Sequence, residues 1–377
     1  MKKICIRSLI LFLCFGSGCS QSVKKESGEK DIISFYTSGL DKLAQDDSKG
    51  AEVDFRKIFD IRKKSPYGYT GLALVALKGM EYRKALRLIR KAVKADDGFV
   101  DAYTARGRIL SARNKRHWFK QAAVSFEHAL GLDPGNEKAL YYFGECYLKN
   151  LSFELAESCY KTVSEKQGPL KKYADEKHKL LLQILETNPL SPEGKRSALA
   201  LTVNRSELSV LLTGELQIMK KLHRHNRQLF ESVFRENLKI RKDKRVNASD
   251  VSSDKNRAWI EYLMPLNIPG ITAYPDGRFY PEKTITRAQL AETIYGIVYL
   301  MKVESVRAVY VKRETRDVED VHKDYYAYDA IIFCVENGLM KTVALNEFLP
   351  NENVSGIDAV TAIRHLHSML EQRSPTP

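Results

Sequence analysis

Apolar and small residues recur along the first half of the chain at a spacing of about 34 residues. Within each period the apolar positions follow a helical spacing twice, which predicts two antiparallel helices joined by a short turn. Small residues such as Gly107 and Ala122 would let paired helices approach closely, and large ones such as Tyr103 and Phe126 would fill the space between pairs. One pair cannot bury its apolar face alone, so the pattern predicts stacked copies over residues 31–170.

The clearest copy, "AYTARGRILSARNKRHWFKQAAVSFEHALGLDPGN", resembles the tetratricopeptide repeat, and four copies are in register. The resemblance implies a helical-hairpin solenoid whose groove binds a protein partner. The ligand-facing positions of such repeats correspond here to Tyr67, Thr70, Arg108, Tyr141, Glu145 and Lys149. Their mix of aromatic and charged groups suits an extended peptide. The alternative is that each is ordinary solvated surface.

Residues 171–246 are predicted to be helical and are strongly basic, with 17 Lys/Arg against 9 Asp/Glu. Within them "MKKLHRHNRQLFESVFRENLKIRKDKR" places apolar residues at a helical spacing among charges, which indicates an amphipathic helix. Two interpretations remain open. The run is either a solvated face with a packed apolar stripe, or a contact for anionic lipid or wall polymer.

The stretch "AYPDGRFYPEKTITRAQLAETI" predicts a turn at Pro275-Asp276-Gly277 followed by a helix. Thr286 is a suitable N-cap for that helix. Arg287 would then stand in the first helical turn, where a cation is unfavourable against the helix dipole. We expect a first-turn arginine to be exposed, so its position asks for an explanation.

This stretch belongs to a unit over 247–303 that begins at Asp250-Val251 and includes Trp259. The unit is repeated over 304–372, beginning at Asp317-Val318, with Gly356 in place of the arginine. Both units resemble the S-layer homology module. A degenerate copy lies within 171–246, where the counterparts of Gly277, Arg287 and Gln289 are Gly194, Arg205 and Glu207.

The S-layer homology resemblance implies binding of acidic cell-wall polysaccharide attached to peptidoglycan, with the arginine and nearby backbone amides holding the acid groups. A carboxylate at a helix N-terminus meets free N–H donors, and an arginine adds two parallel hydrogen bonds. The glycan-binding candidates are Thr286, Arg287, Asp276, Gly277, Trp259 and Arg205. Alternatively, Arg287 pairs with Glu282 or with an acid of a neighbouring copy and staples the repeats. The copy with Gly356 is expected to lack a competent pocket.

The first residues, "MKKICIRSLILFLCFGSGCSQS", combine basic residues, a short apolar run and small residues, which is typical of an export signal over 1–18. The ending "GSGC" resembles a bacterial lipobox, which would make Cys19 the lipidated residue that anchors the chain to a membrane. Ser20 then favours the outer membrane. Ordinary signal cleavage, with Cys19 a bystander, is the alternative. Residues 19–30 are predicted to be a flexible tether.

The net charge of +14 suits an anionic partner, but export argues against nucleic acid. The remaining cysteines, Cys146, Cys159 and Cys334, are too few for a disulfide framework. A Cys146–Cys159 bridge or buried free thiols are both compatible with the pattern. The pairs His223/His225 and His365/His367 are two residues apart and make poor metal sites on a helix. No cofactor or metal is expected.

The sequence therefore predicts an all-α protein, with a tetratricopeptide solenoid followed by a helical S-layer homology domain with short loops. It contains no phosphate loop, nucleophile elbow or zinc-protease motif, so we expect no enzyme. The leading interpretation is a lipid-anchored protein of the cell envelope, facing the periplasm or the cell surface, that binds wall polymer or peptidoglycan and an unidentified envelope protein. The alternative is an assembly or secretion adaptor in which the C-terminal modules are only structural.

Overall fold

The computed structural model describes residues 18–243, 248–301, 318–343 and 346–372. It divides into two compact units, Met1–His178 and Lys179–Pro377, and each is described by itself. In the described ranges all regular structure is helical, and only two isolated backbone bridges occur, Asn204–Thr284 and Thr286–Asn353. The prediction of an all-α fold is therefore confirmed. No helix in these ranges is long and apolar enough to cross a bilayer.

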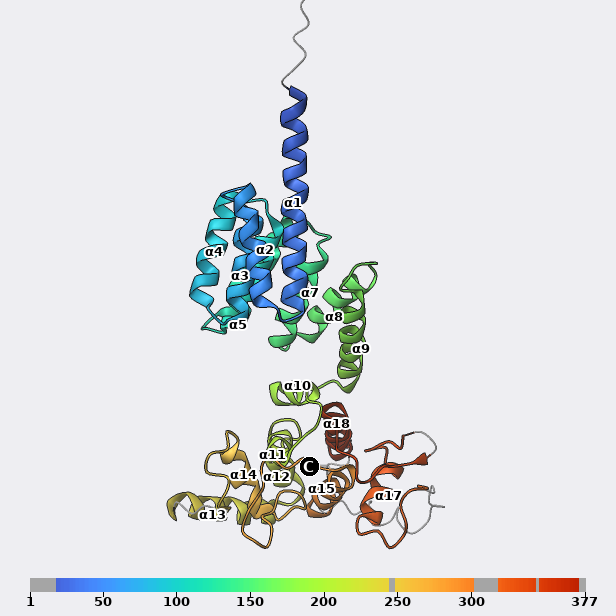
Figure 1. Ribbon diagram of the computed structural model, residues 1–377. Coiled ribbons are helices and arrows are strands. Elements are labelled where there is room, and N and C mark those ends of the chain that lie inside the picture. Colours follow the sequence, from blue (N-terminus) through green and yellow to red (C-terminus); the bar gives the residue numbers. More distant parts are fainter. Residues whose placement is uncertain (1–17, 244–247, 302–317, 344–345, 373–377) are drawn as a thin grey trace, which may run out of the picture. The chain divides into compact units, whose positions relative to one another are not determined.

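The N-terminal unit is a row of helix pairs (Figure 1). Its helices are α1 (Gly18–Ala44), α2 (Ser48–Ile61), α3 (Pro66–Lys78), α4 (Tyr82–Ala95), α5 (Val100–Arg113), α6 (Trp118–Leu132), α7 (Glu137–Lys149) and α8 (Phe153–Ser164). Each odd-numbered helix packs against the even-numbered helix that follows it, and the pairs stack, with α1, α3, α5 and α7 in successive contact. The unit ends inside α9 (Lys171–Thr187), beyond the boundary at 170 that the sequence suggested.

Small residues set the spacing within the pairs, as the sequence pattern predicted. A Cβ atom added at Gly107 would lie 2.6 Å from the ring of Phe126, and one added at Gly144 would lie 2.9 Å from the ring of Tyr160. Both rings are fully buried. The glycines on α5 and α7 therefore leave the space into which the large side chain of the partner helix fits.

The first helix begins earlier than expected. Residues 19–30, predicted as a flexible tether, lie within α1. Lys and Glu, which favour helix, are frequent there, and the helix continues into Ile32 and Tyr36, which are buried in the first pair. Packing of the later turns thus supports the earlier ones. Residues 1–17 of the predicted export signal over 1–18 lie outside the described residues.

The C-terminal unit holds three modules. Their helices are α10 (Pro192–Ala198) and α11 (Arg205–Gly214) in the first, α14 (Arg257–Leu263), η1 (Met264–Leu266) and α15 (Arg287–Leu300) in the second, and α17 (Tyr328–Glu336) and α18 (Gly356–Gln372) in the third. The first two modules are joined through α12 (Ile218–His225) and α13 (Arg227–Asp243). Figure 1 shows these elements in green to red.

A closed ring of backbone hydrogen bonds joins the three modules. The amide of Val203 donates to the carbonyl of Val354, the amide of Val354 to Ile285, and the amide of Ile285 to Val203, each at 3.0 Å. These three side chains are buried. Because each module donates to one neighbour and accepts from the other, the modules are related cyclically rather than in a row.

The helix that follows each ring residue begins with the same kind of cap. The side chains of Asn204, Thr286 and Ser355 accept hydrogen bonds from the amides three residues ahead, at 2.8, 3.3 and 3.1 Å. At Asn204 and Thr286 the third residue reaches back to complete a capping box. The prediction that Thr286 is an N-cap is confirmed, and asparagine performs the same role in the first module.

Candidate binding surfaces

The loop of residues 272–283 in the second module, which we call the Tyr274 loop, carries most of the predicted glycan-binding chemistry. Its turn closes through hydrogen bonds between the backbones of Tyr274, Gly277 and Arg278. Gly277 has a φ of +76°, which glycine adopts without strain. The side chain of Asp276 accepts hydrogen bonds from the amide of Arg278 at 3.0 Å and from the Tyr280 hydroxyl at 2.5 Å. The predicted turn at Pro275-Asp276-Gly277 is thus present.

A carboxylate from the start of the module holds the loop from one side. Asp250 accepts hydrogen bonds from the amides of Phe279 and Tyr280, at 2.8 and 2.7 Å. Tyr280 adopts a φ of +54°, an uncommon conformation for a residue with a side chain. The two charge-assisted bonds from Asp250 offset the cost of that backbone conformation.

An arginine from the first module holds the same loop from beneath. The Arg205 guanidinium donates from Nε to the carbonyl of Phe279 at 2.7 Å and from Nη2 to the carbonyl of Thr272 at 2.6 Å. Its carbon lies 4.5 Å from the Phe279 ring centre and 4.7 Å from that of Tyr274. Burial lowers the pKa of Arg205, yet guanidinium remains charged at neutral pH because its ordinary pKa exceeds about 12. The loop therefore rests on a buried cation.

The outer face of the loop is an open, aromatic hollow of about 450 Å³ lined by Tyr274, Pro275, Asp276, Tyr280 and Lys283. The Lys283 ammonium lies 4.9 Å from the centre of the Tyr274 ring and 3.2 Å from its hydroxyl. Within the described ranges no carboxylate lies at ion-pair distance from Lys283. The hollow therefore combines two aromatic rings with a cation that can accept an anionic partner.

Arg287 stands in the same relation to the loop of the third module, residues 341–352. Its Nε donates to the carbonyl of Phe348 and its Nη2 to that of Lys341, both at 2.6 Å, and its guanidinium lies over the Phe348 ring at 4.6 Å. Arg287 is 8% exposed. The expectation of an exposed first-turn arginine was wrong, because the neighbouring module covers that turn. Burial lowers its pKa.

Arg287 and Arg205 are nearly identical in their contacts, although the sequence suggested that Arg205 matches the motif less well. Arg205 is 5% exposed, and its two hydrogen bonds are as short as those of Arg287. Neither guanidinium meets an acid at ion-pair distance in the described residues. Glu282, the proposed partner of Arg287, instead accepts a hydrogen bond from Asn204 at 3.0 Å. The arginines bind carbonyl oxygens of the next module rather than a carboxylate.

The aspartate that holds the third loop is Asp320, not Asp317. Asp320 accepts hydrogen bonds from the amides of Phe348 and Leu349, both at 2.7 Å, as Asp250 does in the second module. Leu349 has a φ of +56°, like Tyr280. The sequence "DVEDV" offers two Asp-Val pairs three residues apart, and pattern alone aligned the first, Asp317-Val318. Asp317 itself lies outside the described residues.

The third junction is built differently, and this explains Gly356. Helix α10 occupies the place of the loop, and the amide of Gly356 donates to the carbonyl of Ala200 at 3.0 Å. A Cβ atom at position 356 would overlap the carbonyl oxygen of Ser197. An arginine cannot stand there because backbone of the first module fills its space.

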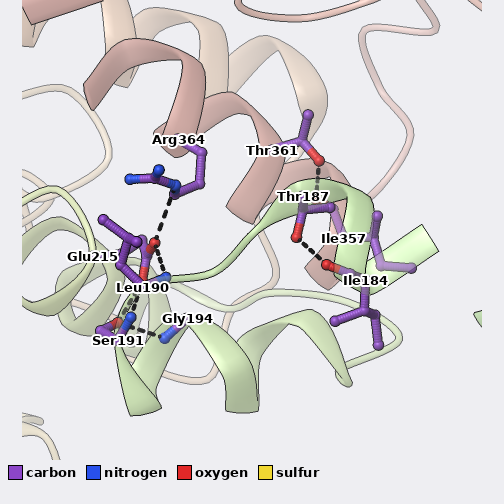
Figure 2. Close-up of polar contacts among 9 residues, drawn as sticks. All are labelled: Ile184, Thr187, Leu190, Ser191, Gly194, Glu215, Ile357, Thr361 and Arg364. Atoms are coloured by element: carbon purple, nitrogen blue, oxygen red, sulfur yellow. Dashed lines mark hydrogen bonds and ion pairs between the residues drawn. The ribbon is translucent and has the colours of Figure 1, made fainter. Parts of the chain in front are cut away.

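Figure 2 shows what joins the first and third modules instead. Glu215, which is fully buried, accepts hydrogen bonds from the amides of Leu190 and Ser191 and from the Ser191 hydroxyl, at 2.8, 2.9 and 2.5 Å. Arg364, two turns along α18 from Gly356, lies 3.6 Å from the same carboxylate. Gly194 belongs to α10 in this cluster, so it is not a counterpart of the turn glycine Gly277.

The other glycan-binding candidates differ in setting. Trp259 lies on α14 and is 45% exposed. Thr286 caps α15 and is partly buried. The residues that sequence reasoning missed are Tyr274, Tyr280 and Lys283 of the hollow. Their positions in the sequence match no known binding motif. Only the folded loop brings the two tyrosines and the lysine together.

In the N-terminal unit, Arg108 is the only predicted partner-binding residue that lines the cavity of about 370 Å³ formed by α1, α3, α5 and α7 in the described part of the array. Tyr67 packs against Tyr36 and Phe99, and Thr70 is fully buried. Glu145 accepts a hydrogen bond from Tyr160 at 2.6 Å. Lys149 donates to the carbonyl of Ser111 at 2.5 Å.

Tyr141 is half-buried against Tyr142 and Tyr160, and burial raises its pKa to about 12. The cavity is lined mainly by residues that sequence reasoning did not select, among them Tyr36, Asp101, Thr104, Lys138 and Tyr142.

The cysteines in the described ranges form no disulfide bond. Cys146, Cys159 and Cys334 are free thiols, and burial raises the pKa of Cys146 and Cys159 to about 11. The alternative of a Cys146–Cys159 bridge is therefore not seen. In the described ranges no group of three or more potential ligands is placed to hold a metal ion. Cys19 falls within α1, where its side chain is not described.

One comparison with known proteins places its match in the C-terminal unit. The profile of the S-layer homology domain matches residues 271–291 and 315–360. Cell surface glycoprotein 1 of Acetivibrio thermocellus is 29% identical over 115 residues, 28% of this chain and 5% of that protein. The Cellulosome-anchoring protein of the same organism is 30% identical over 124 residues, 32% of this chain and 26% of that protein. The chain thus corresponds to a small part of each relative.

A solved structure of Pseudomonas aeruginosa pilF is 18% identical and covers 44% of this chain and 95% of its own, with a TM-score of 0.22. A TM-score this low does not establish a shared fold, and nothing is inferred from it. The helix pairs of the N-terminal unit are established by their own packing. The matches to the C-terminal unit are independent of it. They confirm that this chain contains S-layer homology sequence, in the two modules whose loops Arg205 and Arg287 hold.

Proposed function

We propose that this chain is an exported, non-enzymatic protein of the cell envelope. Its C-terminal unit binds acidic wall polymer, and its N-terminal array binds a protein partner. The S-layer homology matches support wall binding, and the names of the two relatives refer to the cell surface and to anchoring. The stacked helix pairs support protein binding, since such arrays form extended concave surfaces.

The observation that carries the glycan proposal is the hollow on the Tyr274 loop. Flat aromatic rings suit the apolar faces of sugar rings, and the Lys283 ammonium suits a carboxylate or another acid group of the polymer. Arg205 acts through the loop in this proposal. It holds the carbonyls of Thr272 and Phe279, which fixes the rings that the glycan meets.

The corresponding surface of the third module has lost this chemistry. Backbone hydrogen bonds align Tyr274 with Val343, since each amide bonds the carbonyl four residues ahead. The same alignment puts Leu349 where the second module has Tyr280, and Glu352 where it has Lys283. An aliphatic and acidic surface does not attract an acidic glycan. The second module is therefore the binding module, for a reason that differs from the missing arginine at Gly356.

Sedimentation with purified sacculi tests the proposal. The wild type should bind saturably, and Lys283→Glu should weaken binding at least about tenfold, the loss expected for a charge-assisted contact. Tyr274→Ala should also weaken binding, because it removes one of the two aromatic rings of the hollow. Lys255→Glu is the matched control, because Lys255 is exposed in the same module outside the hollow. Sacculi stripped of acidic polymer should not bind. Equal binding by Lys283→Glu and Lys255→Glu would contradict the assignment.

The adaptor alternative, in which the modules are only structural, predicts no saturable binding to sacculi by the wild type. The cavity in the array is the observation that favours it, and an envelope partner captured by the array without any wall binding would establish it. Partner capture and sacculus binding together would support the proposal made above.

Lipid attachment at Cys19 would complete the proposal by joining a membrane, preferably the outer membrane, to the wall. The Cys19→Ala protein should leave the membrane fraction while remaining processed and exported. Labelling with a radioactive fatty acid provides the direct measurement. Membrane retention of the variant, together with an unlabelled wild type, would show that ordinary signal cleavage takes place.

A further inference from the structure

The N-terminal unit contains a cavity of about 370 Å³ on the side formed by α1, α3, α5 and α7. One wall is aliphatic and includes Leu40, Leu43, Leu74 and Leu77. Leu74 is buried, at 7% exposure, whereas Leu40, Leu43 and Leu77 are partly exposed. Apolar surface therefore remains available to a ligand. The size and lining suit one or two large apolar side chains.

The part of the lining that comes from α5 and α7 is largely polar and contains a hydroxyl without a partner in the described residues. Thr104 is 4% exposed, and its Oγ1 is buried without a hydrogen-bond partner. Beside it, Asp101 accepts a hydrogen bond from the Tyr36 hydroxyl at 2.9 Å and lies 3.5 Å from the Lys138 ammonium. A buried hydroxyl that makes no hydrogen bond is costly, and a ligand that supplies a donor or acceptor removes the cost.

The charges of the cavity are unbalanced toward the positive. Its lining includes Lys78, Arg108 and Lys138 but a single acid, Asp101. Lys138 pairs with Asp101, and Lys78 pairs with Asp46.

Arg108 lies over the ring of Tyr142, 3.8 Å from its centre. In the described part of the chain no carboxylate stands at ion-pair distance from Arg108. Arg108 is half-buried and lines the cavity, so one anionic group can be bound there with two parallel hydrogen bonds.

We propose that this cavity binds an extended segment of a partner protein in which an Asp or Glu stands beside a large apolar residue. The carboxylate pairs with Arg108, the apolar side chain enters between the leucines of α1 and α3, and the Thr104 hydroxyl bonds a polar group of the segment. The proposal deepens the protein-binding role of the array given above and rests on it. It assigns to the partner a chemistry, acidic and apolar, that complements a basic and aliphatic cavity.

The test uses the full chain and three labelled peptides that differ in one property. The first alternates Glu with Leu and Phe, the second has Lys in place of Glu, and the third has Ser in place of Leu and Phe. Fluorescence anisotropy should show binding of the first and at least tenfold weaker binding of the other two. Binding of the first should weaken with salt, as charge-mediated contacts do.

Variants locate the binding in the cavity. Arg108→Glu should weaken binding of the acidic peptide at least tenfold. Arg116→Glu, which changes an exposed arginine in the α5–α6 turn, should leave the affinity for that peptide unchanged. Thr104→Val should weaken binding several-fold while raising the melting temperature, because it removes the unpartnered hydroxyl. Circular dichroism checks that each variant is folded.

Two results would overturn the proposal. One is equal affinity for the acidic and basic peptides, and the other is an equal effect of Arg108→Glu and Arg116→Glu. Capture of proteins from envelope extract distinguishes failure of the proposed ligand chemistry from failure of protein binding by the array. The wild type and Arg108→Glu could both retain the same partner, and the acidic peptide could fail to displace it. That result would show that the array binds a protein whose recognised segment has another chemistry. Retention of no protein by the wild type would remove the array's binding role itself.

Discussion

The two units of this chain are both built from repeats, but the repeats are joined in opposite ways. In the N-terminal unit each helix pair packs mainly against its neighbours along the sequence, and contacts such as Gly107 with Phe126 lie within one pair, although the Tyr36–Asp101 hydrogen bond reaches past a neighbour. In the C-terminal unit the backbone bonds of Val203, Ile285 and Val354 close a ring. A row has free faces at every repeat, whereas a ring buries the position at which one module ends and the next begins.

The fate of the arginines illustrates this difference. Arg108 stands on the open side of the row, stacked on Tyr142 and available to an anion. Arg287 stands at a junction of the ring, where it is covered and bonded to the carbonyls of Lys341 and Phe348. An arginine on an open face of a repeat is available to bind a ligand. An arginine that the next repeat covers instead holds the repeats together. The four predictions that follow test this contrast, from the largest effect to the smallest.

Gly356→Ala should be the most damaging substitution, destabilising the C-terminal unit by on the order of 4 kcal/mol, because backbone cannot move aside as a side chain can. The new Cβ would overlap the Ser197 carbonyl and open the junction between α10 and α18. Hydrogen exchange of peptides from these helices is the measurement. Gly131→Ala, whose Cβ would meet nothing within 4 Å, is the control. Protection equal to wild type would show that the ring does not close as described.

Arg287→Ala should destabilise the same unit by about 3 kcal/mol, since two charge-assisted hydrogen bonds are lost and two carbonyls are left unpaired. Arg205→Ala should cost a similar amount because its contacts are the same, and lysine should rescue neither since it lacks the planar fork. The urea midpoint of each variant provides the measurement. Arg278→Ala, at an exposed position, is the control. Unchanged midpoints with a loss of sacculus binding would instead support direct glycan contact.

Gly107→Ala should destabilise the array by about 1–2 kcal/mol, less than the change at Gly356, because the new Cβ would meet a side-chain ring, that of Phe126, and not backbone. The effect should stay local. Hydrogen exchange should rise in α5 and α6 and remain at wild-type levels in α2, as expected for repeats that pack mainly against their neighbours. An equal rise throughout the unit would indicate that the row unfolds as one cooperative block.

Glu371→Gln should have the smallest effect, and one that depends on pH. The hydrogen bond from Lys221, a 1% exposed residue, lowers the pKa of Glu371 below its ordinary value. A carboxyl whose pKa is lower in the folded state contributes stability above its unfolded pKa and loses it as pH falls through the folded pKa. The difference in urea midpoint between wild type and Glu371→Gln should therefore be present at neutral pH and be lost as the pH falls through the lowered pKa of Glu371. A constant difference would exclude the ion pair as its source.

Much of the fold could be predicted because its signals are local. The small and large residues of the array, the cap at Thr286 and the turn at Pro275-Asp276-Gly277 each act over a few positions of the chain. The resemblance to S-layer homology modules likewise rested on a continuous stretch, which the family profile matches at 271–291 and 315–360. The extent of α1 was missed because packing of Ile32 and Tyr36 against Phe55 and Ile58 of α2 supports that helix, and no pattern within residues 19–30 shows this packing.

The candidate site was predicted less well because its chemistry depends on contacts between modules. The sequence by itself determined that an arginine follows the cap in two modules and a glycine in the third. Only the tertiary structure decided that Phe348 and Lys341 lie above Arg287, that Ser197 excludes any side chain at Gly356, and that Asp320 holds the third loop. These partners are separated from one another by tens to hundreds of residues, and no local spacing encodes such an approach. A buried cation is favourable only where carbonyl oxygens are already directed at it, so its role depends on the ring that the three modules form.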